Sequence, residues 1–532
     1  MSKVETYLKK IPGWCLPFGI LMLGALLRLI FLGSMPGGMH QDESFVAWNA
    51  FAIFHEGMDS AGHVFPVYMA DWGDGHSALY VWLTLPFIAL NGGHVTPFLS
   101  RLPQAIVAIC TLLAVYGVVR RLLGRDAALW SLFLLAVCPW HIMMSRWGLD
   151  ANLAPGFLIF GFYFFVRGLE KERYLLLSAF FYGLCLYCYA IMWLAVPVVL
   201  LLQIVYGLAY RKLRINRWSL SAGALLFVLA LPLLLFVAVN QGWLRQIELP
   251  FMTIPAMGGY RGGEIAASLP QIWSNLRTTL SLLWNQNTGA PYDILLPWGL
   301  FYDVGRVFIL FGAGCLVVRT ICGLWKREYR AETFLLIQLL TGGVVCLLVT
   351  AVLHQINALY IPLVLCEAYG VWQLAKFCGR CREAAGKVCV VLVTIIYLLC
   401  LAGFQKDYYT VYRPVADAYF GAGLKDCVEY ALEVCEEKGL DTITVEKGAQ
   451  WPRLLLYTET LPTEYLESVV YDVAPAPASF VSDDILIRTR IDYENLSGDS
   501  VYIIYFIDED TFSPNFELTG FGDWYVAVPR TE

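Results

Sequence analysis

The stretch IPGWCLPFGILMLGALLRLIFLGSMPGGMHQDES, residues 11–44, joins a long apolar run to an adjacent pair of carboxylates, Asp42 and Glu43. An apolar run of about 20 residues is long enough to cross the hydrocarbon core of a bilayer as a helix. No small-residue cleavage site stands before Asp42, so we interpret the run as a retained span and not as a signal peptide. The chain therefore places an acidic pair directly beside a membrane.

The composition extends this interpretation to most of the chain. Its 532 residues are 58% hydrophobic and 15% charged, with a mean hydropathy of +0.60. Soluble domains carry about 25% charged residues. Apolar runs recur through about the first 400 residues, which predicts an α-helical polytopic membrane protein. The expected spans, about eleven in number, lie near residues 11–32, 101–120, 125–144, 152–168, 174–190, 191–209, 218–240, 301–319, 333–353, 357–375 and 387–403.

Basic clusters between these runs predict the orientation. The positive-inside rule places the clusters in the cytoplasm, together with the N-terminus. Residues 33–100 and 241–300 then form two long outer loops. The apolar piece at 79–92 is short and contains Pro86, so we expect an interfacial helix on the outer face and not a span.

The last part of the chain differs in charge. Residues 404–532 hold 24 acidic and 9 basic residues, whereas residues 1–403 hold 19 acidic and 28 basic ones. The piece at 424–439 has helical spacing and a glycine stop, and DTITVEKG (441–448) and DSVYIIYFID (499–508) are typical of strands. We therefore predict a transmembrane domain over 1–403 and a small acidic α/β domain over 404–532, outside the cytoplasm.

Several classes of function are not indicated. Most of the 15 cysteines lie in apolar runs, where cysteine behaves as a small hydrophobe. No P-loop and no GxGxxG after a strand is present, and no HExxH-type spacing suggests a metal site. We expect no cofactor, no divalent metal and no nucleic-acid partner.

Asp42 and Glu43 are the first candidates for chemistry. Asp42 is expected at the N-cap of a helix over 44–54, with Phe45, Trp48 and Phe51 toward the membrane. Plain capping would explain Asp42. A general base would also explain it, because a helix N-terminus stabilises a carboxylate. Two adjacent acids, where one caps adequately, favour the base.

Further polar side chains stand near the expected outer face. Asp74 and His76 lie in a glycine-rich turn, which is either an ordinary loop or a phosphate site. Arg101 and Arg146 lie outside against the positive-inside bias, and such arginines need an anionic partner. That partner is Asp42, Asp150 or a lipid phosphate.

The remaining candidates come from three other segments. His141 ends an expected span, and Asn357 belongs to the stretch HQINALYIP at 354–362. Tyr260 and Arg261 stand between two glycine pairs in the second outer loop. A loop so rich in glycine is flexible, and serves as a lid over a substrate or as a linker.

The order of short motifs resembles the polyprenyl-phosphate-dependent glycosyltransferases of the GT-C superfamily. The most similar groups are the bacterial relatives of protein O-mannosyltransferases and of the lipid A aminoarabinose transferase. The likeness covers about residues 10–400 and is strongest over 36–155. The motifs, in order, are DES (42–44), WGDGHSALYVW (72–82), RLPQA (101–105), RRLLGRDAA (120–128) and PWHIMMSR (139–146).

The resemblance implies roles for individual residues. Asp42 matches the catalytic base of the family, and Glu43 matches its neighbour. His76 stands where the aminoarabinose transferases have a phosphate-binding lysine, although the lysine and its two prolines are absent here. Arg101 matches the arginine that opens the second span. Arg146 and Asp150 match an SR…LD element, one residue shorter than in the O-mannosyltransferases.

One further position departs from the family. Gln355 stands where relatives often carry an arginine before the proline, which weakens a phosphate clamp there.

The resemblance also implies a mechanism. The expected donor is a sugar on a polyprenyl phosphate, and the acceptor is a hydroxyl or amine outside the cytoplasm, on a cell-envelope polymer, a lipid or a protein. Asp42 takes the acceptor proton, the anomeric carbon inverts, and His76, Arg101 and Arg146 stabilise the leaving phosphate. The substrate-binding candidates are Asp74, Asp150, His141, Tyr260, Arg261 and Asn357.

Two other classes of protein are weighed against this one. A transporter or flippase of lipid-linked sugars would show an internal repeat and ionisable residues in mid-span. A non-catalytic assembly protein would explain the acidic domain, but not the ordered set of acids, histidine and arginines.

Overall fold

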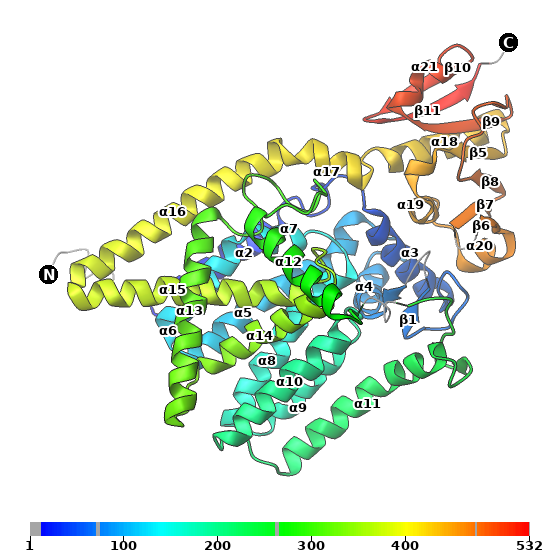
Figure 1. Cartoon of the computed structure of the whole chain (residues 1–532). Coiled ribbons are helices and arrows are strands. Elements are labelled where there is room, and N and C mark those ends of the chain that lie inside the picture. Colours follow the sequence, from blue (N-terminus) through cyan, green and yellow to red (C-terminus); the bar gives the residue numbers. More distant parts are fainter. Residues whose placement is uncertain (1–11, 71–74, 261–264, 474–475, 531–532) are drawn as a thin grey trace.

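The structure, a computed structural model, describes residues 12–70, 75–260, 265–473 and 476–530. A bundle of apolar helices forms the larger part, and a sheet-containing domain stands at one end of it (Figure 1). The helices of the larger part are α2 (Cys15–Leu29), α3 (Gln41–Glu56), α4 (Leu79–Leu90), α5 (Pro97–Leu122), α6 (Arg125–Val137), α7 (Pro139–Met144), α8 (Ala154–Glu170), α9 (Tyr174–Cys185), α10 (Met192–Ala209), α11 (Arg217–Asn240), α12 (Leu269–Asn285), α13 (Asp303–Lys326), α14 (Thr333–Leu348), α15 (Tyr360–Cys381) and α16 (Glu383–Thr410).

The expected spans all coincide with helices, but not all are long enough to cross a membrane unaided. Among the described residues, seven helical segments have the length and composition of a span. They are 97–122, 150–170, 192–209, 217–240, 303–326, 357–381 and 383–410. The spans predicted at 11–32, 174–190 and 333–353 are the shorter helices α2, α9 and α14. The span predicted at 125–144 is broken between α6 and α7, where Pro139 opens the second helix.

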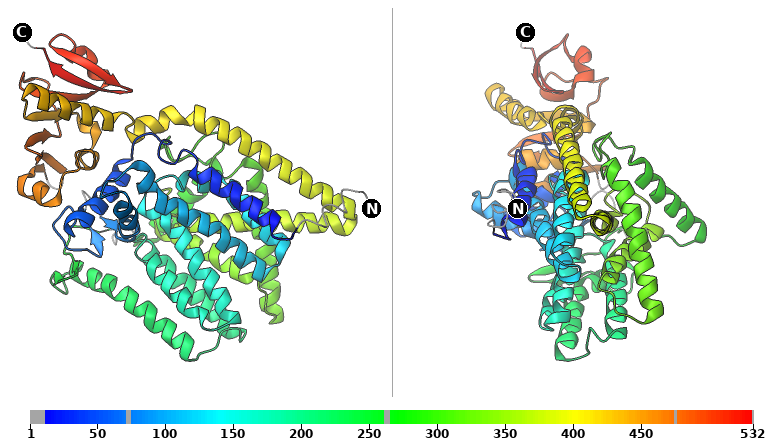
Figure 2. Two further views of the ribbon diagram at one scale, coloured as in Figure 1. Left: turned by 180° about the vertical axis from the view of Figure 1, so that it is seen from behind. Right: turned by 90° about the vertical axis from the view of Figure 1, so that its left-hand side faces the viewer.

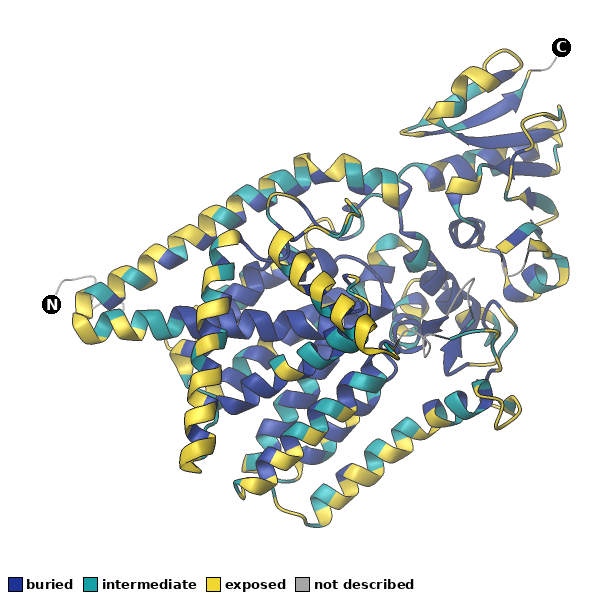
Figure 3. Ribbon diagram, in the orientation of Figure 1, coloured by how far each residue is buried: buried dark blue, intermediate teal, exposed yellow. Residues whose placement is uncertain are grey.

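Burial separates the centre of the bundle from its outside (Figure 3). In α15, 78% of the most apolar window is buried inside the protein, whereas in α11 and α16 the share is 22%. The exposed faces of α11 and α16 are nevertheless rich in leucine, valine and isoleucine. Apolar side chains that face away from the protein over such lengths fit a lipid environment.

Helix α3 sits differently from the prediction. Phe45, Trp48 and Phe51 of α3 are buried within the protein and do not face the membrane. The C-terminal domain covers this face of α3, and the Trp48 indole N–H donates to the carbonyl of Thr460 at 2.9 Å. The apolar pattern of α3 therefore marks a domain interface, which has the same composition as a membrane-facing surface.

The C-terminal domain combines helices with one mixed sheet. Its sheet has the strand order β10-β11-β9-β5-β8-β7-β6. The central β5 pairs in parallel with β8 and β9, while the outer strands pair antiparallel. The elements are α17 (Tyr412–Phe420), α18 (Leu424–Lys438), β5 (Thr442–Val445), α19 (Trp451–Tyr457), α20 (Pro462–Ser468), β6 (Val470–Val473), β7 (Ala476–Ser482), β8 (Ile485–Arg488), β9 (Ser500–Tyr505), α21 (Glu509–Phe512), β10 (Phe516–Phe521) and β11 (Trp524–Pro529).

The junction between the two parts is a continuous helix. α16 runs unbroken from Glu383 to Thr410, so residue 404 lies inside it. Figure 2 shows this helix from behind, extending along the bundle toward the sheet domain. The helix and strands expected at 424–439, 441–448 and 499–508 are present as α18, β5 and β9. A domain boundary at 404 stays a prediction.

Candidate active site

The N-terminus of α3 presents Asp42 in a way that differs from the expected cap. The N-cap is His40, whose Nδ1 accepts from the backbone N–H of Asp42 at 3.3 Å. The carboxylate of Glu43 closes the capping box by accepting the N–H of His40 at 3.2 Å. Burial lowers the pKa of His40, which favours the neutral ring that can act as an acceptor. The Asp42 side chain is therefore not used as a cap.

Asp42 faces a small cavity. The Asp42 side chain is 27% exposed and lines a space of about 210 Å³. Three segments far apart in the sequence meet there and supply Asp42, Asp293 and His354. The other lining residues are His40, Trp147, Leu149, Thr288, Ala290, Tyr292, Ala351, Val352 and Leu353. This cavity, which we call the Asp42 cavity, can hold a small group beside a carboxylate.

Asp293 is a second carboxyl group of this cavity, and the sequence analysis missed it. Burial raises the pKa of Asp293 to about 6, opposed by a hydrogen bond from the Thr288 side chain. Burial also raises the pKa of Tyr292 to about 12, with smaller contributions from Asp293 and Asp42. The Tyr292 phenol therefore lies near both carboxyls. An aspartate between glycine and proline in the outer loop (TGAPYDILLP, 288–297) was the available signal.

Glu43 is turned away from the cavity and into the protein. The side chains of Glu43 and Arg101 are fully buried and form a bidentate pair at 2.7 and 3.0 Å. Glu43 also accepts the backbone N–H groups of His40 and Gly148, at 3.2 and 3.1 Å. This network ties the start of α3 to α5 and to the segment after α7. A part for Glu43 in proton transfer stays a prediction.

Arg101 and Arg146 donate most of their hydrogen bonds to the chain segment that precedes Asp42. Besides Glu43, Arg101 donates to the carbonyls of Leu32, Pro36 and Gly38. Each of the five guanidinium N–H groups of Arg101 thus has a partner. Arg146 likewise uses all five, on one tyrosine and four carbonyls. Its partners are Tyr408, Leu27, Arg28, Phe31 and Met35. The two arginines hold residues 27–38 in place, and phosphate binding by either one stays a prediction.

His76 and Asp150 form a pair behind α3. The Nδ1 atom of His76 lies 3.5 Å from Asp150 Oδ2, and both side chains are almost fully buried. Asp150 also accepts the N–H of Ser77 at 3.0 Å. The His76 ring packs against Phe45 with centroids 5.2 Å apart. Neither residue lines the Asp42 cavity, and a role for either one toward donor or acceptor stays a prediction.

Three other predicted substrate-binding residues, His141, Asn357 and Tyr260, do not line the Asp42 cavity. His141 is buried with its Nδ1 atom 2.5 Å from Arg28 Nη2. Asn357 donates to the carbonyl of Ala151 at 2.6 Å. The Tyr260 hydroxyl accepts from Gln241 at 2.7 Å, at the C-terminal end of α11. Asp74 and Arg261 lie outside the described residues, as does most of the glycine-rich segment proposed as a lid.

The C-terminal domain completes the site, which the sequence did not predict. The buried guanidinium of Arg453 on α19 donates to the carbonyl of Met39 at 2.7 Å, directly before His40. It also donates to the carbonyl of Tyr419 at 2.7 Å. The Phe420 ring packs against His40 and Trp147 with centroids 5.5 and 5.6 Å away. The position of Asp42 thus depends on both parts of the chain.

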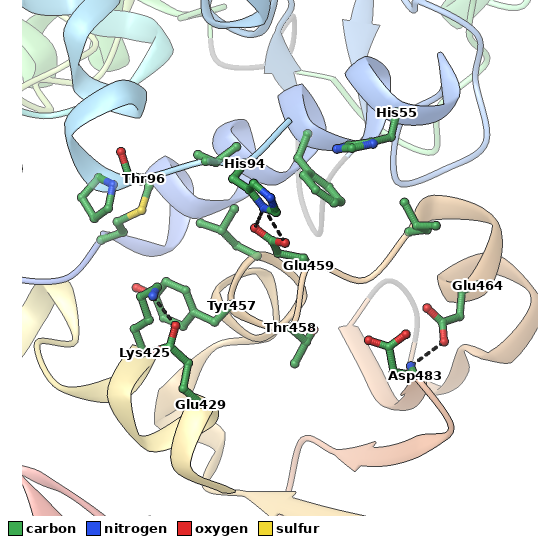
Figure 4. A pocket seen from close by; sticks show the side chains of 16 residues that line it. His55, His94, Thr96, Lys425, Glu429, Tyr457, Thr458, Glu459, Glu464 and Asp483 are labelled. Carbon is green, nitrogen blue, oxygen red and sulfur yellow. Dashed lines mark hydrogen bonds and ion pairs between the residues drawn. The ribbon is translucent and has the colours of Figure 1, made fainter. Parts of the chain in front are cut away.

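A second, larger cavity lies between the two parts (Figure 4). Its volume is about 540 Å³, and both His94, before α5, and Tyr457, on α19, line it. His94 Nδ1 lies 2.9 Å from both carboxylate oxygens of Glu459. Met39 also lines this cavity, so the chain at 39–42 separates it from the Asp42 cavity.

Asp293→Asn tests the electrostatics of the Asp42 cavity. Folding raises the pKa of Asp293 from 3.8 to about 6, so the neutral form is favoured in the fold. The contribution of the neutral Asp293 carboxyl to the stability of the fold is fully present below pH 3.8 and is lost as the pH rises through about 6. We expect Asp293→Asn to leave stability nearly unchanged at pH 4. At pH 7.5 we expect it to increase the free energy of unfolding by up to about 3 kcal/mol, and therefore to raise the melting temperature above that of wild type.

Thermal unfolding of both purified proteins at the two pH values measures this difference. The other titratable residues that line this cavity are Asp42, His40, His354 and Tyr292. All of them are retained in the variant. A difference in melting temperature that is the same at both pH values would contradict the expectation.

Similarity to known proteins defines the class of the fold. ArnT from Cupriavidus metallidurans in the apo state aligns over 97% of this chain and 97% of its own, with a TM-score of 0.52 and 11% identity. The same protein bound to undecaprenyl phosphate also gives 0.52 and 11%, over 97% and 98% of the two chains. An Archaeoglobus fulgidus oligosaccharyltransferase in complex with Zn and sulfate gives 0.50 and 12%, over 82% of this chain and 61% of its own.

The chain therefore has the fold of the GT-C glycosyltransferases, with a sheet-containing C-terminal region, as the sequence predicted. Residues 75–236 also match the model of the family described as dolichyl-phosphate-mannose-protein mannosyltransferase. No curated protein matches the chain. The resemblance to the GT-C superfamily is confirmed.

Proposed function

We propose that the protein is an inverting glycosyltransferase, which transfers a sugar from a polyprenyl-phosphate donor to a hydroxyl or amine outside the cytoplasm. The observation that carries the proposal is Asp42, a partly exposed carboxylate that lines a small cavity in a GT-C fold. The match of residues 75–236 to a mannosyltransferase family supports a lipid-linked hexose as the donor sugar, and a pentose is the alternative that the sequence resemblance leaves open. An ArnT structure bound to undecaprenyl phosphate supports the lipid part.

The mechanism uses Asp42 as a general base. Asp42 accepts the proton of the acceptor while the acceptor oxygen or nitrogen bonds to the anomeric carbon. The bond between that carbon and the phosphate oxygen breaks, and the polyprenyl phosphate leaves as an anion. Attack opposite to the leaving group inverts the carbon, as in single-step glycosidases that use one carboxylate as base.

The arginines contribute to this mechanism through position. Arg101, Arg146 and Arg453 hold the carbonyls of the segment 27–39 that leads to α3. Because these contacts already fix the position of Asp42, little further conformational entropy is lost when it reaches the acceptor proton. His76, Arg101 and Arg146 stay the candidates for stabilising the leaving phosphate, as the resemblance implies.

Within the described ranges, no group of three or more His, Cys, Asp or Glu side chains is arranged to hold a metal ion. We propose that transfer does not depend on a divalent metal, because the polyprenyl phosphate leaves as an already stable anion. Turnover should be unchanged after dialysis against a chelator. Loss of turnover that added Mg²⁺, Mn²⁺ or Zn²⁺ restores would overturn this point.

The decisive experiment separates transfer from transport. Purified protein is placed in vesicles with radiolabelled undecaprenyl-phosphate mannose as the probe, and the lipid-linked label is followed over time with an envelope extract as acceptor. A glycosyltransferase consumes the donor and moves the label to a product. A flippase changes the leaflet of the lipid but leaves it intact, and an assembly protein does neither.

The orientation is a proposal with its own test. We propose that the basic ends of the helices are cytoplasmic and the C-terminal domain is outside. In intact cells, a membrane-impermeant maleimide should label Glu436→Cys, on the exposed face of α18, and should not label the exposed Cys381 at the end of α15. Cys381 should react only after lysis. The reverse pattern would refute the orientation and, with it, an extracytoplasmic acceptor.

A further inference from the structure

The Asp42 cavity has an unusual balance of charge for a site that binds sugar phosphates. Its described lining includes the carboxyls of Asp42 and Asp293 and no lysine or arginine. The nearby Arg101 and Arg146 direct their N–H groups to backbone carbonyls and to other partners. His40 is held toward its neutral form, because burial lowers its pKa. The described wall of the cavity is therefore acidic above pH 6, where Asp293 is ionised.

Aromatic rings also line the Asp42 cavity. The rings of Trp147 and Tyr292 stand edge to face with centroids 6.0 Å apart. Tyr292 also packs on His40, 5.5 Å away. The position of Tyr292 is fixed from α17, because the Tyr412 hydroxyl donates to its carbonyl at 2.5 Å. Aromatic rings offer flat apolar faces and polar edges, which suit the carbon faces and hydroxyl edges of a sugar.

The size of the cavity restricts what enters. Pockets for drug-sized ligands have volumes of about 300–1,000 Å³, whereas the Asp42 cavity has about 210 Å³. It can hold a single small group, of the order of one sugar ring or one alkylamine. The rest of a larger acceptor must stay outside.

We propose that the Asp42 cavity binds the accepting group itself and selects a neutral or cationic one, a sugar hydroxyl or a primary amine, and that Asp293 sets this selectivity. The proposal rests on the proposed function, because it takes the group beside Asp42 to be the nucleophile. A nucleophile that needs a base carries a proton, as hydroxyls and amines do. An anionic acceptor would meet two carboxylates without a matching cation among the described lining residues, and like charges disfavour such binding.

Asp293 has a different part from Asp42 in this arrangement. Asp42 contacts the reacting proton, whereas Asp293, on another segment of the cavity wall, accepts a hydrogen bond from a second hydroxyl or ammonium of the same group. The Thr288 side chain, which opposes the effect of burial on the pKa of Asp293, lines the same cavity. Removing its charge should alter which groups bind and leave the base in place.

The test is a binding measurement on the full chain without any donor. Glucosamine, glucose and glucuronate have similar size and carry a positive, no and a negative charge at pH 7. Their binding to purified protein in lipid nanodiscs is measured by saturation-transfer NMR, with competition among the three. We expect glucosamine to bind about tenfold or more tightly than glucuronate, with glucose between them.

Three variants assign the effect to Asp293. Asp293→Asn should reduce the preference for glucosamine over glucuronate to about threefold or less, while Asp293→Glu should retain the order. Asp303→Asn is the matched control, because Asp303 is an exposed aspartate that follows the same outer loop and pairs with Arg306. Its binding order should equal that of the wild type. Melting curves of each variant show that the fold is kept.

The outcomes separate this inference from the proposed function. Equal binding of glucuronate and glucosamine to the wild type, or an unchanged preference in Asp293→Asn, overturns the inference even if donor is consumed. The expected order together with an intact donor lipid overturns the proposed function, and leaves an acidic sugar site in a protein of another class.

Discussion

Asp42→Asn should reduce sugar transfer by roughly 10²–10⁴-fold, the effect expected when a positioned proton acceptor is removed. The structure makes this a clean substitution. His40, not Asp42, caps α3, and the Asp42 carboxylate points to a cavity and not into the core. Asparagine has nearly the same size, so the cavity keeps its shape. The loss of charge in the first turn should cost only about 0.3–1 kcal/mol of stability.

The measurement is the rate of loss of the donor lipid, together with its dissociation constant. Donor binding should be almost unchanged, because Asp42 is proposed to act on the acceptor. Asp126→Asn is the matched control, since Asp126 is also the second residue of a helix, α6, and is exposed away from the cavity. Its turnover should equal that of the wild type. Normal turnover by a folded Asp42→Asn protein would remove the base from the mechanism.

Glu43→Gln should have a large effect on folding and a smaller direct effect on chemistry. The substitution leaves the guanidinium of Arg101 buried without its counter-charge. Breaking a buried ion pair in this way costs about 3–5 kcal/mol. We expect a strong fall in the yield of folded protein and in its melting temperature. The N–H groups of His40 and Gly148 also lose a charged acceptor, which loosens the start of α3.

The comparison for this prediction is an exposed ion pair that also contains a glutamate. Glu383 pairs with Lys387 in the first turn of α16, and its side chain is 84% exposed. Glu383→Gln should leave the melting temperature almost unchanged, because exposed ion pairs contribute little to stability. A Glu43→Gln protein as stable as Glu383→Gln would show that the buried pair does not support the fold. Loss of turnover without loss of stability would restore Glu43 to the chemistry.

Much of the fold could be predicted from periodicity and charge. Apolar runs separated by basic clusters predicted the long apolar helices of the bundle, and the helix and strands of the C-terminal part were recognised from their spacing. The helix α12 was missed, because Leu269–Asn285 lies in a segment predicted as a loop. The break at Pro139 and the early end of α9 at Cys185 were missed, because hydropathy measures apolar length and not where a helix stops. A buried apolar helix and a membrane-facing one also have the same composition, which explains the error for α3.

The candidate site was predictable only where one short stretch carried the signal. Asp42 stood out beside Glu43, and the cavity confirms that it is accessible. Asp293 was not selected, because its importance comes from a fold that brings residue 293 to residue 42. For the same reason the arginines were assigned to phosphate. The sequence shows where a charged residue stands relative to a span. Only the coordinates show that the N–H groups of Arg101 and Arg146 donate to carbonyls of residues 27–38.

The bond from Arg453 to the carbonyl of Met39 spans 414 positions of the chain and joins the C-terminal domain to the residue before the cap of α3. The two parts of the protein therefore cannot be exchanged freely between homologues. A chimera that takes its C-terminal domain from another member of the fold would have to import the matching segment 32–56 as well, or the base would lose its alignment. During evolution, a substitution in one of these two segments should be tolerated only together with a compensating substitution in the other.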